Sequence, residues 1–79
     1  MPNTDQLVEK VRLRLELPPP AECRAIRVRA RASQEEVAEV VGVTRETIAR
    51  YEAGTRRPRG TQLETYLTVL RVLARESAP

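Results

Sequence analysis

Residues 33–54 constrain the fold of this chain more than any other segment, because two short helical patterns there are separated by a turn. Ser33 is followed three residues later by Glu36, which is the spacing of a capping box at a helix N-terminus. Thr44 is a second candidate N-cap, and it follows Gly42, a residue suited to ending the preceding helix. The pattern therefore predicts two short helices joined by a tight turn.

The apolar and polar side chains of this segment are distributed as two crossed helices require. The positions expected where the helices meet are Val37, Ala38, Val41, Val43, Ile48 and Tyr51. The outward face of the second helix, predicted at residues 45–53, consists of Arg45, Glu46, Ala49, Arg50 and Ala53. This is the layout of a helix-turn-helix, whose second helix can enter the major groove of DNA.

The segment also resembles the Xre-type, or phage-repressor-like, helix-turn-helix family, over roughly residues 21–73. The turn glycine Gly42, the Tyr-Glu-x-Gly ending at Gly54 and a basic loop with Pro58 occur together, which is more specific than one motif alone. The matching positions are Gln34, Glu35, Val37, Ala38, Gly42, Val43, Thr44, Ile48, Tyr51, Glu52, Gly54 and Pro58. The resemblance implies an all-α, compact four- to five-helix lambda-repressor-like domain, here with an extra N-terminal helix.

The chain is expected to consist of an N-terminal helix at residues 1–17, a proline hinge at 18–20 and the helix-turn-helix domain at 21–76. Asn3 is the candidate N-cap of the first helix, with Gln6 as its reciprocal partner. Apolar residues occur on two sides of this helix: Leu7, Val8, Val11 and Leu15 on one side, Leu13 and Leu17 on the other. Because the sequence VRLRLEL also alternates with period two, a β-strand remains an alternative here.

The rest of the domain also reads as helix. A helix is expected at about residues 19–31, since proline is tolerated in the first turn. TRRPRG is expected to be a loop, because Pro58 keeps the residue before it out of helical geometry. Thr61 and Glu64 have capping-box spacing and are expected to open a last helix that reaches about residue 75. Its core stripe is Leu63, Tyr66, Leu67, Leu70, Leu73 and Ala74, and Val69 and Val72 lie beside and opposite that stripe.

Positive charge is concentrated near the second helix of the motif. The chain has 79 residues and a formal net charge of +3. Between Arg45 and Arg59 there are five arginines and two glutamates, so this stretch alone has an excess of three positive charges. A basic patch of this kind is the electrostatic footprint of a surface that binds phosphate. The alternative is a solvated basic face without a partner.

Candidate DNA-contacting residues follow from this face and this patch. Arg45 and Arg50 are expected to contact bases, because arginine can bond both major-groove acceptors of guanine, O6 and N7. Glu46 can accept from a cytosine amino group, and Ala49 lies on the same face. The resemblance adds Gln34, since the family's glutamine at this place tends to bond phosphate and brace the reading helix. The other candidates for phosphate contact are Thr44, Thr47, Arg56, Arg57 and Arg59.

Two further interpretations are structural. The resemblance implies an ion pair between Arg27, on the first helix of the domain, and Glu52, at the end of the reading helix. Such a pair would tie the reading helix to its scaffold. The single cysteine, Cys23, shares a helical face with Ile26 and Ala30, so we expect a buried apolar residue rather than a reactive thiol.

The composition argues against enzymatic chemistry. The chain has no histidine and one cysteine, so it lacks the pieces of a histidine-activated nucleophile and of a metal-ligand cluster. It also lacks a glycine-rich nucleotide-binding loop. We therefore expect no enzyme activity, no metal and no cofactor. The polar start MPNTDQ is unlike a signal peptide, and no apolar run approaches the ~20 residues of a membrane span, so a cytoplasmic location without membrane contact is expected.

These patterns predict sequence-specific binding of double-stranded DNA through the major groove, by a small transcriptional regulator such as a phage-type repressor. The alternatives are a recombination accessory or architectural factor, and an antitoxin-like module that binds a protein through its terminal helices. One reading helix covers few base pairs, so a homodimer is expected, at least on DNA. The spare apolar positions Leu13, Leu17, Val69 and Val72 are expected either to form its interface or to seal the N-terminal helix onto its own domain. No small-molecule ligand is evident.

Overall fold

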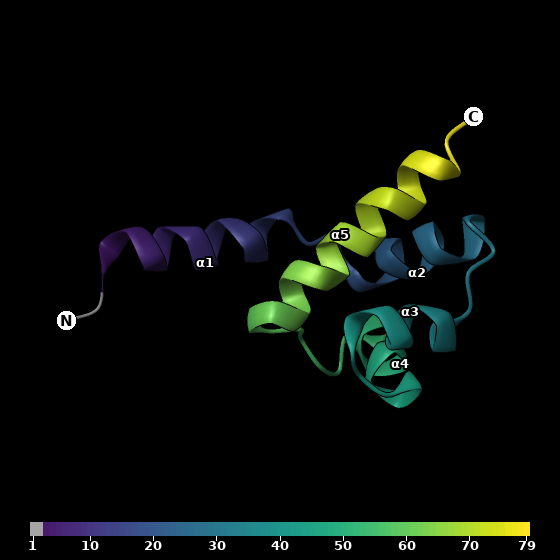
Figure 1. Cartoon of the computed structure of the whole chain (residues 1–79), viewed down its shortest axis with the longest axis horizontal. Coiled ribbons are helices and arrows are strands. Elements are labelled where there is room, and N and C mark those ends of the chain that lie inside the picture. Colours follow the sequence, from purple (N-terminus) through teal and green to yellow (C-terminus); the bar gives the residue numbers. More distant parts are fainter. Residues whose placement is uncertain (1–2) are drawn as a thin grey trace.

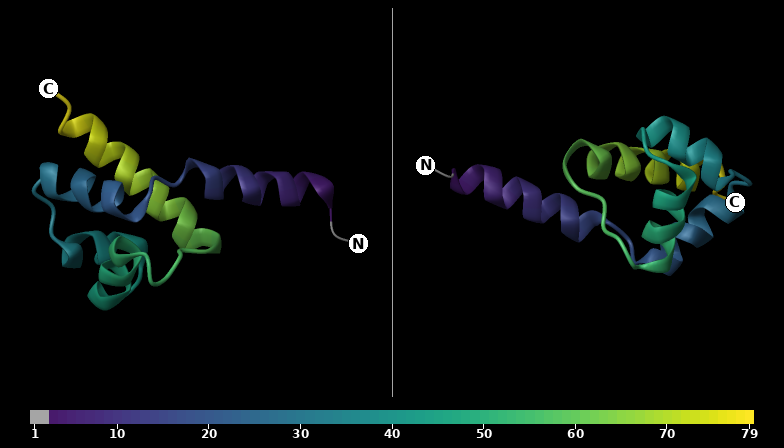
Figure 2. Two further views of the ribbon diagram at one scale, coloured as in Figure 1. Left: turned by 180° about the vertical axis from the view of Figure 1, so that it is seen from behind. Right: turned by 90° about the horizontal axis from the view of Figure 1, so that it is seen from below.

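The computed structural model describes residues 3–79, and every regular element in that range is an α-helix. The helices are α1 (Thr4–Glu16), α2 (Pro20–Arg29), α3 (Gln34–Val41), α4 (Arg45–Ala53) and α5 (Gly60–Glu76). Helices α2 to α5 pack into one bundle, and α1 projects from it as an arm (Figures 1 and 2). The all-α prediction is confirmed, and the strand alternative for the N-terminal segment is wrong. Residues 1 and 2 of that predicted segment lie outside the described residues.

Local hydrogen bonds fix where α3 and α4 begin. The Ser33 hydroxyl accepts from the amide of Glu36 at 3.0 Å, and the Glu36 carboxylate accepts from the amide of Ser33 at 2.8 Å. The Thr44 hydroxyl accepts from the amide of Thr47 at 3.2 Å. Gly42, with φ +83°, ends α3 in the left-handed conformation that glycine adopts without steric cost. Both helices therefore begin directly after the N-caps that the sequence predicts, and α4 has the predicted bounds 45–53.

Gly54 ends α4, and both its backbone conformation and its contact with Pro20 favour glycine there. Its φ is +77°, and a Cβ atom added there would lie 3.3 Å from Cγ of Pro20. Gly42 has a similar φ, but an added Cβ would meet nothing within 4 Å. A substitution at Gly42 therefore tests backbone strain alone, whereas one at Gly54 tests strain together with steric crowding by Pro20.

Alanine at Gly42 is expected to cost about 1–2 kcal/mol of unfolding free energy, the penalty of left-handed geometry alone. Alanine at Gly54 should cost more, because Pro20 must also move. Urea unfolding of the two variants measures the difference. Equal losses of unfolding free energy in the two variants would show that Pro20 can shift without a measurable cost.

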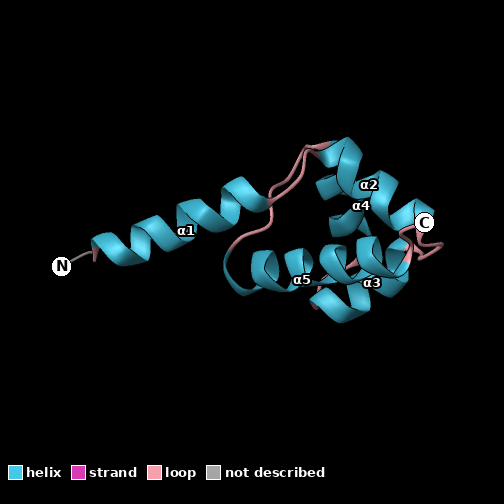
Figure 3. Ribbon diagram, turned by 90° about the horizontal axis from the view of Figure 1, so that it is seen from above, coloured by secondary structure: helices cyan, strands magenta, loops and turns pink. Residues whose placement is uncertain are grey.

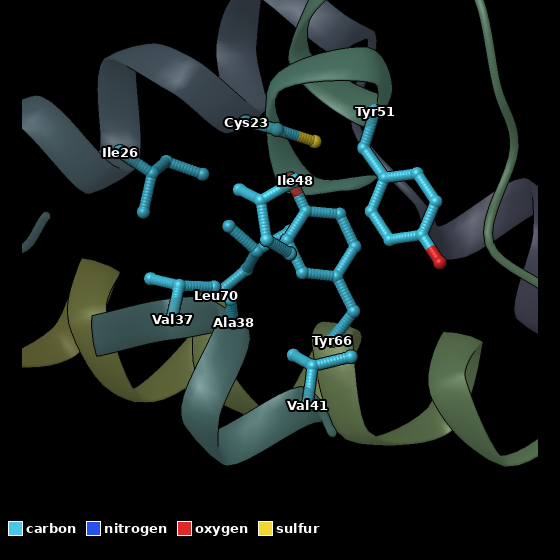
Figure 4. Packing of buried hydrophobic residues seen from close by; sticks show 9 residues of the cluster. All are labelled: Cys23, Ile26, Val37, Ala38, Val41, Ile48, Tyr51, Tyr66 and Leu70. Carbon is cyan, nitrogen blue, oxygen red and sulfur yellow. The ribbon is translucent and has the colours of Figure 1, made fainter. Parts of the chain in front are cut away.

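The core lies between the four helices of the bundle (Figure 4). Ile48, in the middle of α4, has no exposed surface, and the rings of Tyr51 and Tyr66 have centroids 5.2 Å apart. The buried cluster is Cys23, Ile26, Val37, Ala38, Val41, Ile48, Tyr51, Tyr66 and Leu70. Burial of Cys23, which is 2% exposed, raises the pKa of its thiol and agrees with the prediction of an apolar core role.

Several predicted helix ends differ from the structure. Helix α5 begins at Gly60 with Arg59 as its N-cap, so Thr61 is already inside the first turn and the capping box with Glu64 does not form. Helix α2 starts at Pro20 and stops at Arg29, whereas the sequence predicts residues 19–31.

The start of α1 also differs in its cap. The Asn3 side chain accepts from the amide of Asp5 at 2.8 Å, in place of a reciprocal pair with Gln6. The helix begins at Thr4 as the capping role of Asn3 requires.

Helix α1 contacts the bundle near its C-terminal end. The Arg71 guanidinium on α5 donates to the Glu16 carboxylate at 2.7 Å, and Leu17 packs partly against the core. Leu13 is half-buried, and Val69 also packs against the core. Of the four positions expected either to form a dimer interface or to seal the N-terminal helix, Val72 is the most exposed, at 40%. Among residues 3–79 no helix is long and apolar enough to cross a membrane.

Candidate nucleic-acid interface

The outward face of α4 carries the residues expected to read bases. Arg45, Glu46 and Arg50 are exposed, and Ala49 is half-buried beside them. The opposite face of the same helix is in the core, where Ile48 is fully buried. Because one side of α4 is anchored, its polar side is presented to solvent in a fixed orientation.

Gln34, the first residue of α3, links the two ends of α4. Its Nε2 donates to Oε1 of Glu52 at 3.1 Å, near the C-terminus of α4. Its Oε1 accepts from Nη1 of Arg45 at 3.1 Å, at the N-terminus of α4. Gln34 therefore braces the helix and holds an exposed arginine in one position. Nε2 carries a second N–H that neither bond uses, and its contact with a phosphate stays a prediction.

Arg27 and Glu52 form an ion pair between α2 and α4. Nε of Arg27 lies 2.5 Å from Oε2 of Glu52, and Nη2 lies 2.9 Å from Oε1, so the contact is bidentate. Only 12% of the Arg27 side chain and 4% of the Glu52 side chain are exposed. Nη1 of Arg27 also donates to the carbonyl of Ala32 at 2.9 Å. The structure thus places together the two residues that the family resemblance pairs.

The electrostatics of Glu52 follow from these contacts. Burial acts to raise the pKa of its carboxyl, but hydrogen bonds from Arg27 and Gln34 outweigh burial and hold that pKa below its ordinary value. The same pair raises the pKa of Arg27. Glu52 is therefore a charged anchor inside the bundle, paired with Arg27 and with 4% of its side chain exposed.

The two threonines at the start of α4 use their hydroxyl groups locally. The Thr44 and Thr47 hydroxyl oxygens lie 2.9 Å apart, and Thr44 also caps the helix. Thr47 is only 8% exposed. Of the predicted phosphate-binding residues Thr47 is the least accessible, which leaves it poorly placed to contact a phosphate. Thr44 remains exposed.

The loop between α4 and α5 supplies three exposed arginines, Arg56, Arg57 and Arg59, around a buried Pro58. They line a groove of about 1110 Å³ together with Arg14 of α1 and the proline hinge. Sequence reasoning did not single out Arg14, because no local pattern connects α1 with this loop. Its positive charge extends the basic surface toward the N-terminal arm.

Helices α3 and α4, joined by the short turn at Gly42 and with the arginine-bearing face of α4 outward, form the helix-turn-helix arrangement of DNA-binding domains. The family model described as helix-turn-helix matches residues 24–76. The chain belongs to this family, the lambda-repressor-like or Xre-type helix-turn-helix proteins, and is a sequence-specific DNA-binding regulator of that kind. Comparisons with curated proteins and with solved structures found no match. In the described part of the chain, no three His, Cys, Asp or Glu side chains are grouped as metal ligands.

Proposed function

We propose that this protein is a small transcriptional repressor of the phage type, which inserts α4 into the major groove of double-stranded DNA as a homodimer. The observation that carries the proposal is the anchoring of α4. Ile48 fixes its inner face in the core, and Gln34 holds Arg45 in place on its outer face. A reading helix needs this rigidity, because base recognition depends on the position of a few side chains.

Each exposed residue of the face has a proposed role. Arg45 and Arg50 donate to guanine O6 and N7, and Glu46 accepts from cytosine. Ala49 allows close approach to the base edges. Oε1 of Glu46 lies 3.9 Å from Nη2 of Arg45, so the proposed acceptor and the proposed donor are adjacent on the reading face. The proposed phosphate contacts are Gln34, Thr44, Arg56, Arg57 and Arg59.

Selection from a random DNA pool tests this function. A repressor dimer is expected to enrich a short palindrome, with two half-sites related by the symmetry of the protein. Enrichment of tandem direct sites would favour a recombination accessory factor. Failure to enrich any site would contradict the proposal and favour a protein-binding module. A reporter gene placed behind the enriched palindrome should then lose expression when the chain is present, and increased expression would contradict the repressor role.

A further inference from the structure

Helix α1 carries an apolar stripe that no residue in the described range 3–79 covers. Leu15 is 80% exposed, Leu7 58%, Val8 48% and Val11 39%, and no residue of α1 is buried. The helix extends away from the bundle in every view (Figures 1, 2 and 3). A helix of 13 residues is marginal in water without packing of an apolar face. We therefore expect a partner surface to pack against this stripe.

The spacing of the stripe matches the seam of a two-stranded coiled coil. Thr4, Val8, Val11 and Leu15 are separated by four, three and four residues, the alternation that keeps one face toward a neighbouring helix. Leu7 flanks this seam. Leu13, which is half-buried, lies on the opposite side of α1. The free seam is thus distinct from the contact of α1 with its own bundle.

The distribution of charge along α1 indicates which partner helix covers the stripe and in which direction it runs. The first half of α1 carries Asp5 and Glu9, and the second half carries Lys10, Arg12 and Arg14. Glu16, at the end, is already paired with Arg71 of α5. Two copies of α1 in parallel would set like charges side by side. Two antiparallel copies set the acidic half of each against the basic half of the other, which lowers the energy of that arrangement.

We propose that α1 pairs antiparallel with α1 of a second copy of this chain, so that the apolar stripe becomes a symmetric dimer interface. In this register Asp5 of one protomer lies beside Arg12 of the other, twice by symmetry. Arg12 contacts Glu9 at 3.4 Å within its own helix, but both side chains are about 60% exposed, which leaves Arg12 free to exchange partners. The proposal deepens the proposed function, because it gives an interface to the homodimer on which that function rests. It is tested without DNA, so its failure is distinguishable from a failure to bind DNA.

The arrangement has a geometric consequence. Each bundle follows the C-terminal end of its α1, so the two bundles lie at opposite ends of a helix pair about 20 Å long. Helix α4 lies within the bundle, apart from the projecting helix α1 (Figures 1 and 3). Dimerisation through α1 therefore leaves both reading helices uncovered.

Sedimentation equilibrium of the full chain at micromolar to high micromolar concentration tests the interface. The parent is expected to dimerise with a micromolar dissociation constant, because the paired surface is small. Val8→Glu should shift the chain to monomer. Val40→Glu is the matched control, since Val40 is 64% exposed but lies on α3. A parent that stays monomeric, or a dimer that survives Val8→Glu, would overturn the proposal, as would equal loss from both variants.

A charge exchange keeps the test meaningful if Val8→Glu unwinds α1. Asp5→Arg and Arg12→Asp should each weaken the dimer, by roughly three- to tenfold, because each replaces attraction by repulsion. The double variant, with the two charges exchanged, should restore the parent dissociation constant. Absence of restoration, with helix content unchanged by circular dichroism, would show that the antiparallel register is wrong.

Discussion

Glu52→Ala is expected to lower the unfolding free energy by about 3 kcal/mol or more, as the loss of one partner of a buried ion pair does. The change removes the acceptor of two bonds from Arg27 and one from Gln34. Arg27, with 12% of its side chain exposed, then keeps a poorly solvated positive charge. The substitution therefore removes both the ion pair between α2 and α4 and the hydrogen bond from Gln34 of α3.

The measurement is urea unfolding, with Glu9→Ala as the control. Glu9 also pairs with an arginine, Arg12, but both side chains are about 60% exposed. An exposed pair of this kind contributes about 0–1 kcal/mol. Burial, rather than the count of ion pairs, is therefore the cause under test. Equal losses from Glu52→Ala and Glu9→Ala would mean that the Arg27–Glu52 pair contributes no more than a surface contact.

Acid pH should remove the same stabilisation. The folded state holds the pKa of Glu52 below that of the unfolded chain, so the pair stabilises the fold at pH values above the unfolded carboxyl pKa, about 4.3. This contribution falls as pH drops through the folded pKa. The stability of the parent and of Glu52→Ala should therefore converge in acid, measured by thermal unfolding from pH 7 downward. If the difference in stability between the parent and Glu52→Ala stayed constant down to low pH, the destabilisation would come from lost packing rather than from the lost charge.

The bounds of α3 and α4 are predictable because their signals are local. Ser33, Glu36 and Thr44 bond to backbone groups within one turn, and Gly42 adopts its conformation whatever packs around it. Thr61 and Glu64 carry the same local signal but no capping box, because the chain after Pro58 enters α5 at Gly60. A cap works only when the preceding backbone arrives in extended geometry at that residue.

Other features depend on tertiary placement. Periodicity puts Leu13 and Leu15 on different sides of α1, but it does not say which side meets the bundle. The sequence leaves open whether Leu13 and Leu17 seal the N-terminal helix onto its own domain or form a dimer interface. The structure half-buries both and exposes Leu7 and Leu15. The two hydrogen bonds of Gln34, one with Glu52 and one with Arg45, likewise require α3 to cross α4. No local sequence pattern encodes that crossing.

Arg50→Ala and Arg57→Ala are expected to weaken DNA binding in different ways. Arg50 lies on the proposed reading face of α4, so its loss should cost roughly 1–3 kcal/mol on the best site and relax preference at one base pair. Arg57 lies in the exposed loop beside Pro58, where we propose that it neutralises a phosphate. Its loss should weaken every sequence by a similar factor.

The salt dependence of binding separates the two roles. A side chain that neutralises one phosphate releases about one counterion, so Arg57→Ala should lower the slope of log affinity against log salt by about one unit. Arg50→Ala should leave a nearly parental slope if Arg50 contacts bases alone. Fluorescence anisotropy at several salt concentrations, on the selected site and on single-base variants of it, gives both quantities. Equal and sequence-independent losses from the two changes would contradict α4 as the reading helix, because a base contact must distinguish between sequences.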